Sequence, residues 1–195
     1  MASGQGRRFG SNKLLAPLPG GCMMEYSLAC VPRDKFDRLL VVTRHPEVEQ
    51  LAKKQGLPVL LHNLEARNEI IRLALQSMQG VDGCMFLPGD QPLCQPDSLR
   101  RLADAFAQEP NCIHRLAWGD QGQSPVLFPA HLFDQLCCLP PKKGGGVVIL
   151  NNPHLVRLTQ AQWEWELWDV DTPQALERLA QLPAAAKPAQ GPQPF

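Results

Sequence analysis

Short apolar runs alternate with helical patterns along most of this chain. Branched and apolar residues indicate buried strands at 38–43, 57–61, 84–88 and 112–118, with a further strand expected near 166–168. Amphipathic spacing between them predicts helices at 47–54, 65–78, 96–107, 130–136 and 173–182. Strands that alternate with helices favour an α/β fold, in which helices cover both faces of a mostly parallel sheet. The chain of 195 residues is long enough for one such domain.

Charge and hydropathy exclude several classes of partner. Nineteen basic and nineteen acidic residues cancel, so no overall field favours nucleic acid or an anionic membrane. The sequence has no apolar run of about eighteen residues, the length expected of a transmembrane helix. The basic amino end is not followed by the apolar stretch of a secretory signal. We therefore expect a cytoplasmic protein that binds neither nucleic acid nor membrane.

Cysteines and histidines show no metal-site spacing. The seven cysteines include no C-x-x-C pair, and in a reducing compartment they are typical free thiols. Cys94 is the one candidate for a catalytic thiol, because it follows an expected active-site loop. The histidines are dispersed, without the i, i+4 pairing of a metal-binding helix. We interpret all five as structural or surface residues: His45, His62, His114, His131 and His154.

The first thirteen residues form a glycine-rich, basic segment. Its three glycines allow the backbone to approach a ligand closely and to present successive N–H groups to an anion. Arg7, Arg8 and Lys13 add positive charges that can clamp phosphate oxygens. The spacing fits neither a P-loop (G-x-x-x-x-G-K-[ST]) nor the dinucleotide-binding fingerprint (G-x-G-x-x-G). The segment is therefore interpreted as a triphosphate-binding loop of another kind, with a basic surface turn as the alternative.

This segment resembles the signature loop of the nucleotidyltransferases, A-[AGS]-G-x-[GS]-x-R-[FM]-G-x-x-K. The matching positions are Ala2, Ser3, Gly4, Gly6, Arg8, Phe9, Gly10 and Lys13. Within that superfamily it is most similar to the molybdenum-cofactor nucleotidyltransferases, and to their cytidylyl branch. The resemblance implies a three-layer, Rossmann-like nucleotidyltransferase fold with Arg8 and Lys13 as catalytic residues. It also implies that the nucleotide is bound by Ala2, Ser3, Gly4, Gly6, Arg8 and Lys13.

Two acidic segments complete the expected site. Asp90 lies in Leu87-Pro-Gly-Asp-Gln-Pro, at the end of a predicted strand, where ligands gather in open α/β sheets. This run resembles the family's G-D-x-P segment, whose aspartate binds Mg²⁺. Asp169-Val-Asp-Thr-Pro resembles the D-[IV]-D-T-P segment of the cytidylyl enzymes, which implies Asp171 as a second metal neighbour. Taken alone, the first run could be only a turn and the second only a helix cap at Thr172.

The expected acceptor side is less regular. Gly122-Gln-Ser-Pro-Val-Leu-Phe resembles the family's G-x-P-V-L-F segment, which implies that Gly122, Ser124 and Pro125 line the acceptor side of the cleft. Two segments depart from the family. Residues 142–146 lack the aspartate that relatives carry, and residues 64–69 replace the usual Gly-Met and serines. The sequence therefore does not identify the residues that recognise the nucleotide base and the acceptor.

The two ends of the chain carry further expectations. The family's phosphate loop follows a central first strand, whereas here the loop begins at residue 1. We expect that strand to be missing, because the start codon is assigned too late or the gene is truncated. Residues 183–195 are rich in proline and alanine, which predicts a disordered tail. The nucleotidyltransferase domain would then span 1–182.

The resemblance implies transfer of CMP from CTP to the terminal phosphate of the molybdopterin cofactor, with Mg²⁺ and with release of pyrophosphate. The implied partners are CTP or GTP, the molybdopterin cofactor, and a molybdenum hydroxylase that receives the product. The alternatives are a guanylyltransferase for the same cofactor, a sugar- or alditol-phosphate nucleotidyltransferase, and a non-catalytic cofactor-binding or delivery protein. The short chain argues against the sugar enzymes. Asp90 argues against pure binding, which needs no metal carboxylate.

Overall fold

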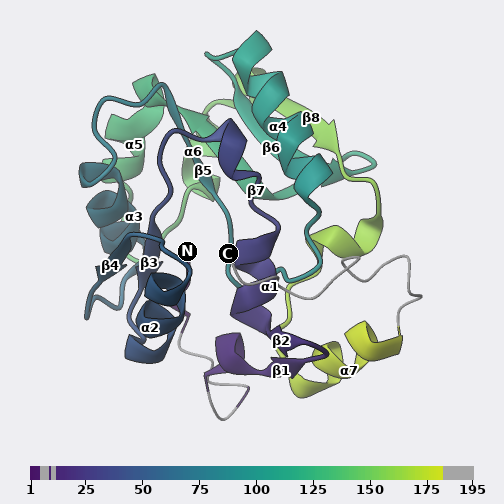
Figure 1. Cartoon of the computed structure of the whole chain (residues 1–195). Helices are drawn as coiled ribbons and strands as arrows, with labels where there is room; N and C mark the ends of the chain where they lie inside the picture. The colour runs from purple at the N-terminus through teal and green to yellow at the C-terminus, as the bar shows by residue number, and fades with distance from the viewer. Residues whose placement is uncertain (5–8, 10–11, 182–195) are drawn as a thin grey trace.

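The computed structural model describes residues 1–4, 9 and 12–181, and most of its strands form two hydrogen-bonded groups (Figure 1). The first group pairs β3 (Val41–Thr43) with β4 (Val59–Leu61) in parallel. The second has the order β5-β7-β6-β8, which are Gly83–Phe86, Gln121–Pro129, Ile113–Trp118 and Val156–Gln160 respectively. In this group β7 is antiparallel to both neighbours, whereas β6 and β8 are parallel.

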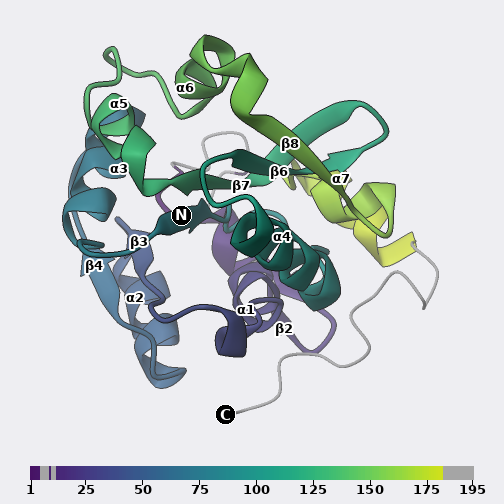
Figure 2. The ribbon, with the colours of Figure 1, turned by 90° about the horizontal axis from the view of Figure 1, so that it is seen from above.

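Two residues at the amino end join these groups. Ala2 forms a parallel bridge to Thr43 beyond β3. The Met1 nitrogen donates to the carbonyl oxygen of Leu87, just beyond β5, at 2.7 Å. Figures 1 and 2 accordingly place the amino end between β3 and β5. The two groups therefore lie as parts of one twisted layer.

Helices cover both faces of this layer (Figure 2). One face carries α1 (Met23–Ala29), α2 (Pro46–Lys54) and α4 (Pro96–Gln108). The other carries α3 (Arg67–Gln76), α5 (Phe133–Cys137) and α6 (Gly146–Asn151). The remaining elements are a hairpin of β1 (Pro17–Leu18) and β2 (Gly21–Cys22), α7 (Pro173–Gln181), and short 3-10 turns at Lys13–Leu15, Arg33–Lys35, Ala130–Leu132, Pro153–Leu155 and Glu164–Leu167. The predicted three-layer α/β arrangement is confirmed.

Apolar helix faces fix these layers. On α3, Ile71 and Leu75 pack in one cluster with Phe128 of β7. On α4, Leu99 and Leu102 are fully buried. Both α2 and α4 begin at a proline, which suits the first helical position because that residue has no intrahelical partner for its N–H. Burial of these faces orients the loops at the carboxyl ends of β3, β4 and β5 toward one edge of the layer.

The carboxyl-terminal third differs from the prediction. The strand expected near 166–168 is wrong, since Glu164–Leu167 is a 3-10 turn. The last strand is instead β8, which pairs in parallel with β6. The acceptor segment, for which no strand was predicted, lies within β7, the longest strand among the described residues. The predicted tail at 183–195 lies outside the described residues. Among the residues that are described, no helix is long and apolar enough to span a bilayer.

Glu166 explains why a turn replaces the expected strand. Its carboxylate is fully buried and accepts backbone N–H groups from Gln162 at 2.8 Å, Trp163 at 3.0 Å and Gln95 at 3.1 Å. The first two contacts close the chain into a tight turn. The third contact joins this turn to the segment that follows Asp90, so Glu166 helps to hold that segment in place.

Removal of the Glu166 carboxylate is expected to destabilise the fold. Glu166→Ala would leave three backbone donors without their acceptor, and we expect it to lower the free energy of unfolding by about 3 kcal/mol. Urea denaturation measures the change. Glu164→Ala, on the exposed side of the same turn, is the matched control. Equal stabilities for the two variants would contradict the bracing role of Glu166.

Candidate active site

Three segments that are distant in sequence meet at one lysine. The Lys13 Nζ atom lies 2.6 Å from Asp90 Oδ2 and 2.6 Å from Asp171 Oδ1. The lysine side chain is 8% exposed, whereas those of Asp90 and Asp171 are 24% and 44% exposed. The three residues therefore form a charged cluster that opens toward solvent on its carboxylate side.

Backbone contacts hold each of these side chains in place. Lys13 begins a 3-10 turn whose preceding residue, Asn12, accepts from the Leu14 N–H through its side chain at 3.2 Å. Before Asp90, the Gly89 N–H donates to the Met1 carbonyl at 2.9 Å. A Cβ at Gly89 would lie 3.2 Å from Met24 Sδ and 3.3 Å from Met1 O, so the close approach of the two segments favours glycine.

The third segment docks directly on the second. The Val170 N–H donates to the Asp90 carbonyl at 2.9 Å, and the Val170 side chain is buried. The Gln91 side-chain amide donates to Asp169 Oδ1 at 3.0 Å and to the Leu167 carbonyl at 3.3 Å. Asp169 and Asp171 are two residues apart in an extended segment and so share one face, on which Asp171 contacts Lys13 and Asp169 pairs with Gln91.

Electrostatics at this cluster favour a further cation. Burial alone would lower the pKa of the Lys13 ammonium, but the hydrogen bonds that it donates to Asp171 and Asp90 outweigh burial and raise the pKa. Partial desolvation, followed by the charge of Asp90, raises the pKa of Asp169. One lysine thus faces three neighbouring carboxyl groups, and the cluster carries an excess of negative charge.

The donor set suits a divalent metal ion that is shared with a phosphate. The Asp90 and Asp171 oxygens contact the same nitrogen, so both are within reach of one small cation. Within the described ranges no group of three or more His, Cys, Asp or Glu side chains forms a metal cage. Mg²⁺ is usually bound through one or two carboxylates together with waters and substrate phosphates. The residues present fit that mode of binding.

The start of the expected nucleotide loop lies beside this cluster. Ala2 is buried, and its carbonyl accepts from the Thr43 hydroxyl at 2.8 Å. A Cβ at Gly4 would lie 4.0 Å from the Lys13 side chain, which places the loop backbone against the lysine. Gly6 and Arg8 lie outside the described residues. Of the predicted nucleotide-binding residues, the structure therefore brings Ala2, Ser3, Gly4 and Lys13 together.

Two histidines contact the same loop. The ring of His62 accepts from the Leu64 N–H at Nδ1, so its Nε2 carries a hydrogen and donates to the Ser3 hydroxyl at 2.8 Å. Ser3 in turn donates to the Val42 carbonyl at 3.2 Å. Burial, followed by the charge of Arg44, lowers the pKa of His62, which keeps the ring neutral near pH 7.

His45 makes the second contact, with Nε2 2.9 Å from the Gly4 carbonyl. The dispersed spacing of the histidines indicates structural or surface roles for both, and it gives no sign of their contact with the nucleotide loop. The available signal was their position, because each follows the carboxyl end of a predicted strand. Such ends meet at one edge of a parallel sheet, where ligands bind.

The predicted acceptor residues all lie in β7. Val126 pairs with Phe86, so the cis-linked Ser124–Pro125 continues β7 alongside the end of β5, just before the Asp90 loop. Gly122 lies farther along, opposite Ala117 in the β6–β7 hairpin. A Cβ there would lie 2.7 Å from Leu158 Cδ2, so packing explains this glycine. Ser124 and Pro125 therefore lie beside the end of β5, whereas Gly122 lies in the part of β7 that pairs with β6 near the hairpin turn.

Comparison with known proteins identifies the chain. The model of the MobA-like NTP transferase domain matches residues 1–158. The chain belongs to this family. Residues 1–158 are accordingly an NTP transferase domain.

Solved structures agree with this family fold. Rv0371c from Mycobacterium tuberculosis H37Rv is 25% identical, with a TM-score of 0.80, and the alignment covers 93% of this chain and 96% of that one. A nucleotidyl transferase from Methanothermobacter is 22% identical, with a TM-score of 0.79 and coverage of 92% and 93%. Among curated proteins, the bifunctional protein GlmU of Desulfitobacterium hafniense is 31% identical over 106 residues, or 52% of this chain. The chain spans only 23% of the length of that relative.

The structure also places residues 64–69 and 142–146, the segments that depart from the family pattern in sequence. The 142–146 loop lies against the start of α3: the Lys142 N–H donates to Asn68 Oδ1 at 2.9 Å, and a Cβ at Gly144 would lie 2.6 Å from Arg67 Cδ. The two segments that depart from the family in sequence therefore contact one another.

Cys94 is buried, and hydrogen bonding with Cys30, followed by burial, raises the pKa of its thiol well above the ordinary range. A neutral, buried thiol is no nucleophile.

Proposed function

We propose that this nucleotidyltransferase transfers CMP from CTP to the terminal phosphate of the molybdopterin cofactor and releases pyrophosphate. The observation that carries the proposal is the cluster of Lys13, Asp90 and Asp171 beside the glycine-rich loop, which is a site for a triphosphate with a divalent cation. Rv0371c, which is 24% identical to this chain, has also been solved in complex with manganese, which is in keeping with a divalent cation in a protein of this fold.

In this mechanism the protein mainly positions charges. The backbone around Ser3 and Gly4 binds the triphosphate, and Lys13 lies where it can neutralise the α-phosphate and the departing pyrophosphate. Asp90 and Asp171 would hold Mg²⁺, which supplies positive charge to the phosphate oxygens when it is bound. Arg8 is assigned the same neutralising role on the resemblance.

The reaction exchanges one phosphoanhydride for another. An oxygen of the acceptor phosphate attacks the α-phosphorus in line, and the bond from that phosphorus to the β-phosphate oxygen breaks. A phosphate monoester is already ionised at neutral pH, so no dedicated general base is required. Ser124 and Pro125 are proposed to border the acceptor, because they lie beside the end of β5.

The choice of cytidine rests on the loop sequence Ala2-Ser3-Gly4. The guanylyl branch favours a second glycine where this chain has Ser3, and here the Ser3 hydroxyl is held by His62 and Val42. The proposal of cytidine therefore rests on the serine at this position.

Thermal unfolding with each of the four nucleoside triphosphates tests the proposal. We expect CTP with Mg²⁺ to raise the melting temperature by several degrees, since ligand at about 100 times its Kd adds about 2.7 kcal/mol. CTP without the metal should have little effect. A larger shift with GTP would move the protein to guanylyl transfer, and no shift with any triphosphate would contradict the proposed substrate site.

Transfer itself is then measured with radiolabelled CTP and purified molybdopterin cofactor. The expected products are the cytidylylated cofactor and pyrophosphate in equal amounts. Sugar phosphates serve as the competing acceptors. Turnover with a sugar phosphate, and none with the cofactor, would overturn the proposed acceptor while leaving nucleotidyl transfer intact.

A further inference from the structure

Three consecutive residues at the start of the nucleotide loop are each contacted by a polar side chain from the carboxyl ends of β3 and β4. The contacts join Thr43 Oγ1 to the Ala2 carbonyl at 2.8 Å, His62 Nε2 to the Ser3 hydroxyl at 2.8 Å, and His45 Nε2 to the Gly4 carbonyl at 2.9 Å. They engage two carbonyl groups and a hydroxyl, and none of the backbone N–H groups that would bind a phosphate.

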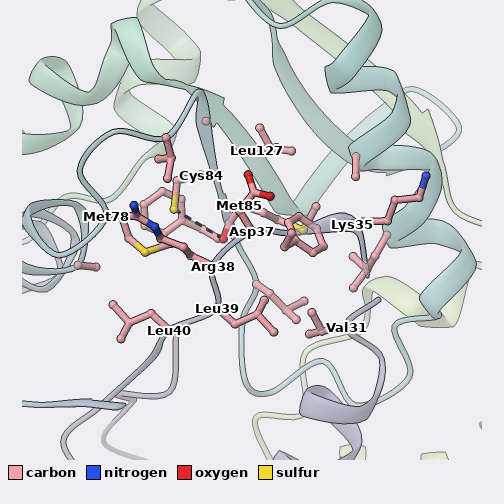
Figure 3. Close-up of a pocket in the computed structure, with 18 of the residues that line it drawn as sticks. Val31, Lys35, Asp37, Arg38, Leu39, Leu40, Met78, Cys84, Met85 and Leu127 are labelled. Atoms are coloured by element: carbon pink, nitrogen blue, oxygen red, sulfur yellow. Dashed lines mark hydrogen bonds between the residues drawn. The ribbon is translucent and has the colours of Figure 1, made fainter. Parts of the chain in front are cut away.

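Packing between β3 and β5 gives this loop little support. A cavity of about 860 Å³ separates the two strands, and Met1 is among the residues that line it. Figure 3 shows Leu39 and Leu40 on one wall of this cavity, with Cys84 and Met85 across from them. The polar contacts with the ends of β3 and β4 therefore hold the start of the loop.

Both ring nitrogens of His62 take part in these contacts. The Leu64 N–H donates to Nδ1 at 3.1 Å, so the hydrogen of the neutral ring is on Nε2. Nε2 then donates to the Ser3 hydroxyl, which donates its own hydrogen to the Val42 carbonyl at 3.2 Å. The donors follow one direction from Leu64 to Val42, and they fix the orientation of the Ser3 side chain.

The surroundings of His62 keep its ring neutral. Burial, followed by the charges of Arg44 and His45, lowers the pKa of the ring. The carboxylate of Glu65 lies 4.0 Å from the Arg44 guanidinium. A neutral ring offers one donor and one acceptor, which match Ser3 and the Leu64 N–H, whereas a protonated ring would direct a second N–H at the Leu64 N–H.

We propose that His62 is a positioning residue for nucleotide binding, which holds Ser3 and thereby orders the start of the loop before the triphosphate arrives. Gly4 follows directly, and glycine has the largest conformational freedom to lose. Order that is already present in the free protein does not have to be established on binding, so it favours affinity. The inference rests on the proposed binding of a nucleoside triphosphate at this loop, and it gives His62 no contact with the reacting atoms.

Two substitutions separate the two hydrogen bonds of His62. An asparagine side chain can accept from the Leu64 N–H but is too short to reach Ser3, whereas a glutamine amide can donate to Ser3. We expect His62→Asn to raise the Kd and the KM for CTP with Mg²⁺ about tenfold, the effect of one lost hydrogen bond, and to change kcat by less than about twofold. His62→Gln should keep both constants within about threefold of the parent values.

The matched control is His131→Asn. His131 is exposed and lies at the opposite edge of the sheet, because it follows Pro129, which pairs with Gly83 at the start of β5. Its KM for CTP should equal that of the parent chain. A double-mutant cycle adds Ser3→Ala: once the hydroxyl is removed, His62→Asn should raise KM no further.

NMR of the ring nitrogens gives a readout that needs no nucleotide. We expect His62 to carry its hydrogen on Nε2 at neutral pH, and this hydrogen to exchange slowly with water. Ser3→Ala should speed the exchange, because the acceptor of that hydrogen is removed.

Three results would overturn the inference. The first is an unchanged KM in His62→Asn, and the second is an equal rise in His62→Asn and His62→Gln, which would indicate a structural role alone. The third is a ring that carries its hydrogen on Nδ1. If the parent chain bound neither CTP nor GTP, the proposed function would fail, whereas the NMR experiment would still decide whether His62 holds Ser3.

Discussion

Asp90→Asn is expected to lower kcat for nucleotidyl transfer by at least about 100-fold while the protein stays folded. The substitution keeps the shape of the side chain and removes the charge that, with Asp171, would hold the metal. Lys13 keeps Asp171 as a partner at 2.6 Å, so the cluster is not dismantled. The measurement is steady-state turnover at saturating Mg²⁺, with circular dichroism to verify folding.

The control for this variant is Asp120→Asn, which removes the same charge from the exposed tip of the β6–β7 hairpin. We expect its turnover to match that of the parent chain. A titration with Mn²⁺ adds a second readout, because loss of one of two carboxylate ligands should weaken metal binding. If Asp90→Asn kept full turnover, Asp90 would not be a metal ligand and the proposed mechanism would be wrong.

Local patterns predicted α2, α3, α4, α5 and α7, although not α1 or α6, and they predicted much of the site. Amphipathic spacing placed α3 and α4 to within a few residues, because helix periodicity is a property of neighbouring positions. Resemblance to known loops selected Lys13, Asp90 and Asp171, which the structure brings into contact. Their metal-binding and catalytic roles stay predictions.

Long-range pairing could not be predicted in this way. The antiparallel strand β7 contains Gly122 and Pro125, which disfavour a strand assignment, and it forms because two neighbours supply its hydrogen bonds. Glu166 was missed for a related reason. A charged residue in a Trp-rich stretch is typical of a surface position, and one of the three backbone donors that make the burial of Glu166 favourable belongs to Gln95, which is distant in sequence. Contacts of this kind have no signal in a single sequence.

Lys13→Met is expected to lower the stability of the metal-free protein and to strengthen its binding of a metal ion. Methionine keeps much of the length of the side chain but leaves the carboxylates of Asp90 and Asp171 without their shared cation. Breaking a buried ion pair costs about 3–5 kcal/mol. Because Asp171 is 44% exposed, solvent screens part of this effect, and we expect a loss of about 2 kcal/mol in metal-free buffer. Urea denaturation in the presence of a chelator measures it.

Lys35→Met is the matched control, since Lys35 contacts Asp104 at the same distance of 2.6 Å but on the surface, with side chains 34% and 54% exposed. We expect its stability to change by less than about 0.5 kcal/mol. A metal-free Lys13→Met protein as stable as Lys35→Met would show that the lysine does not neutralise the cluster.

Addition of a divalent cation should restore most of the stability that Lys13→Met loses. In the parent chain the Lys13 ammonium lies between the two carboxylates, so an incoming metal ion must displace or repel it. In Lys13→Met that competition is gone, and we expect Mn²⁺ to bind more tightly and to restore most of the lost stability. Nucleotidyl transfer should nevertheless stay low, because a metal ion at the carboxylates does not replace the charge that Lys13 brings to the α-phosphate. Restored turnover together with restored stability would mean that Lys13 only fills the metal position and has no catalytic role.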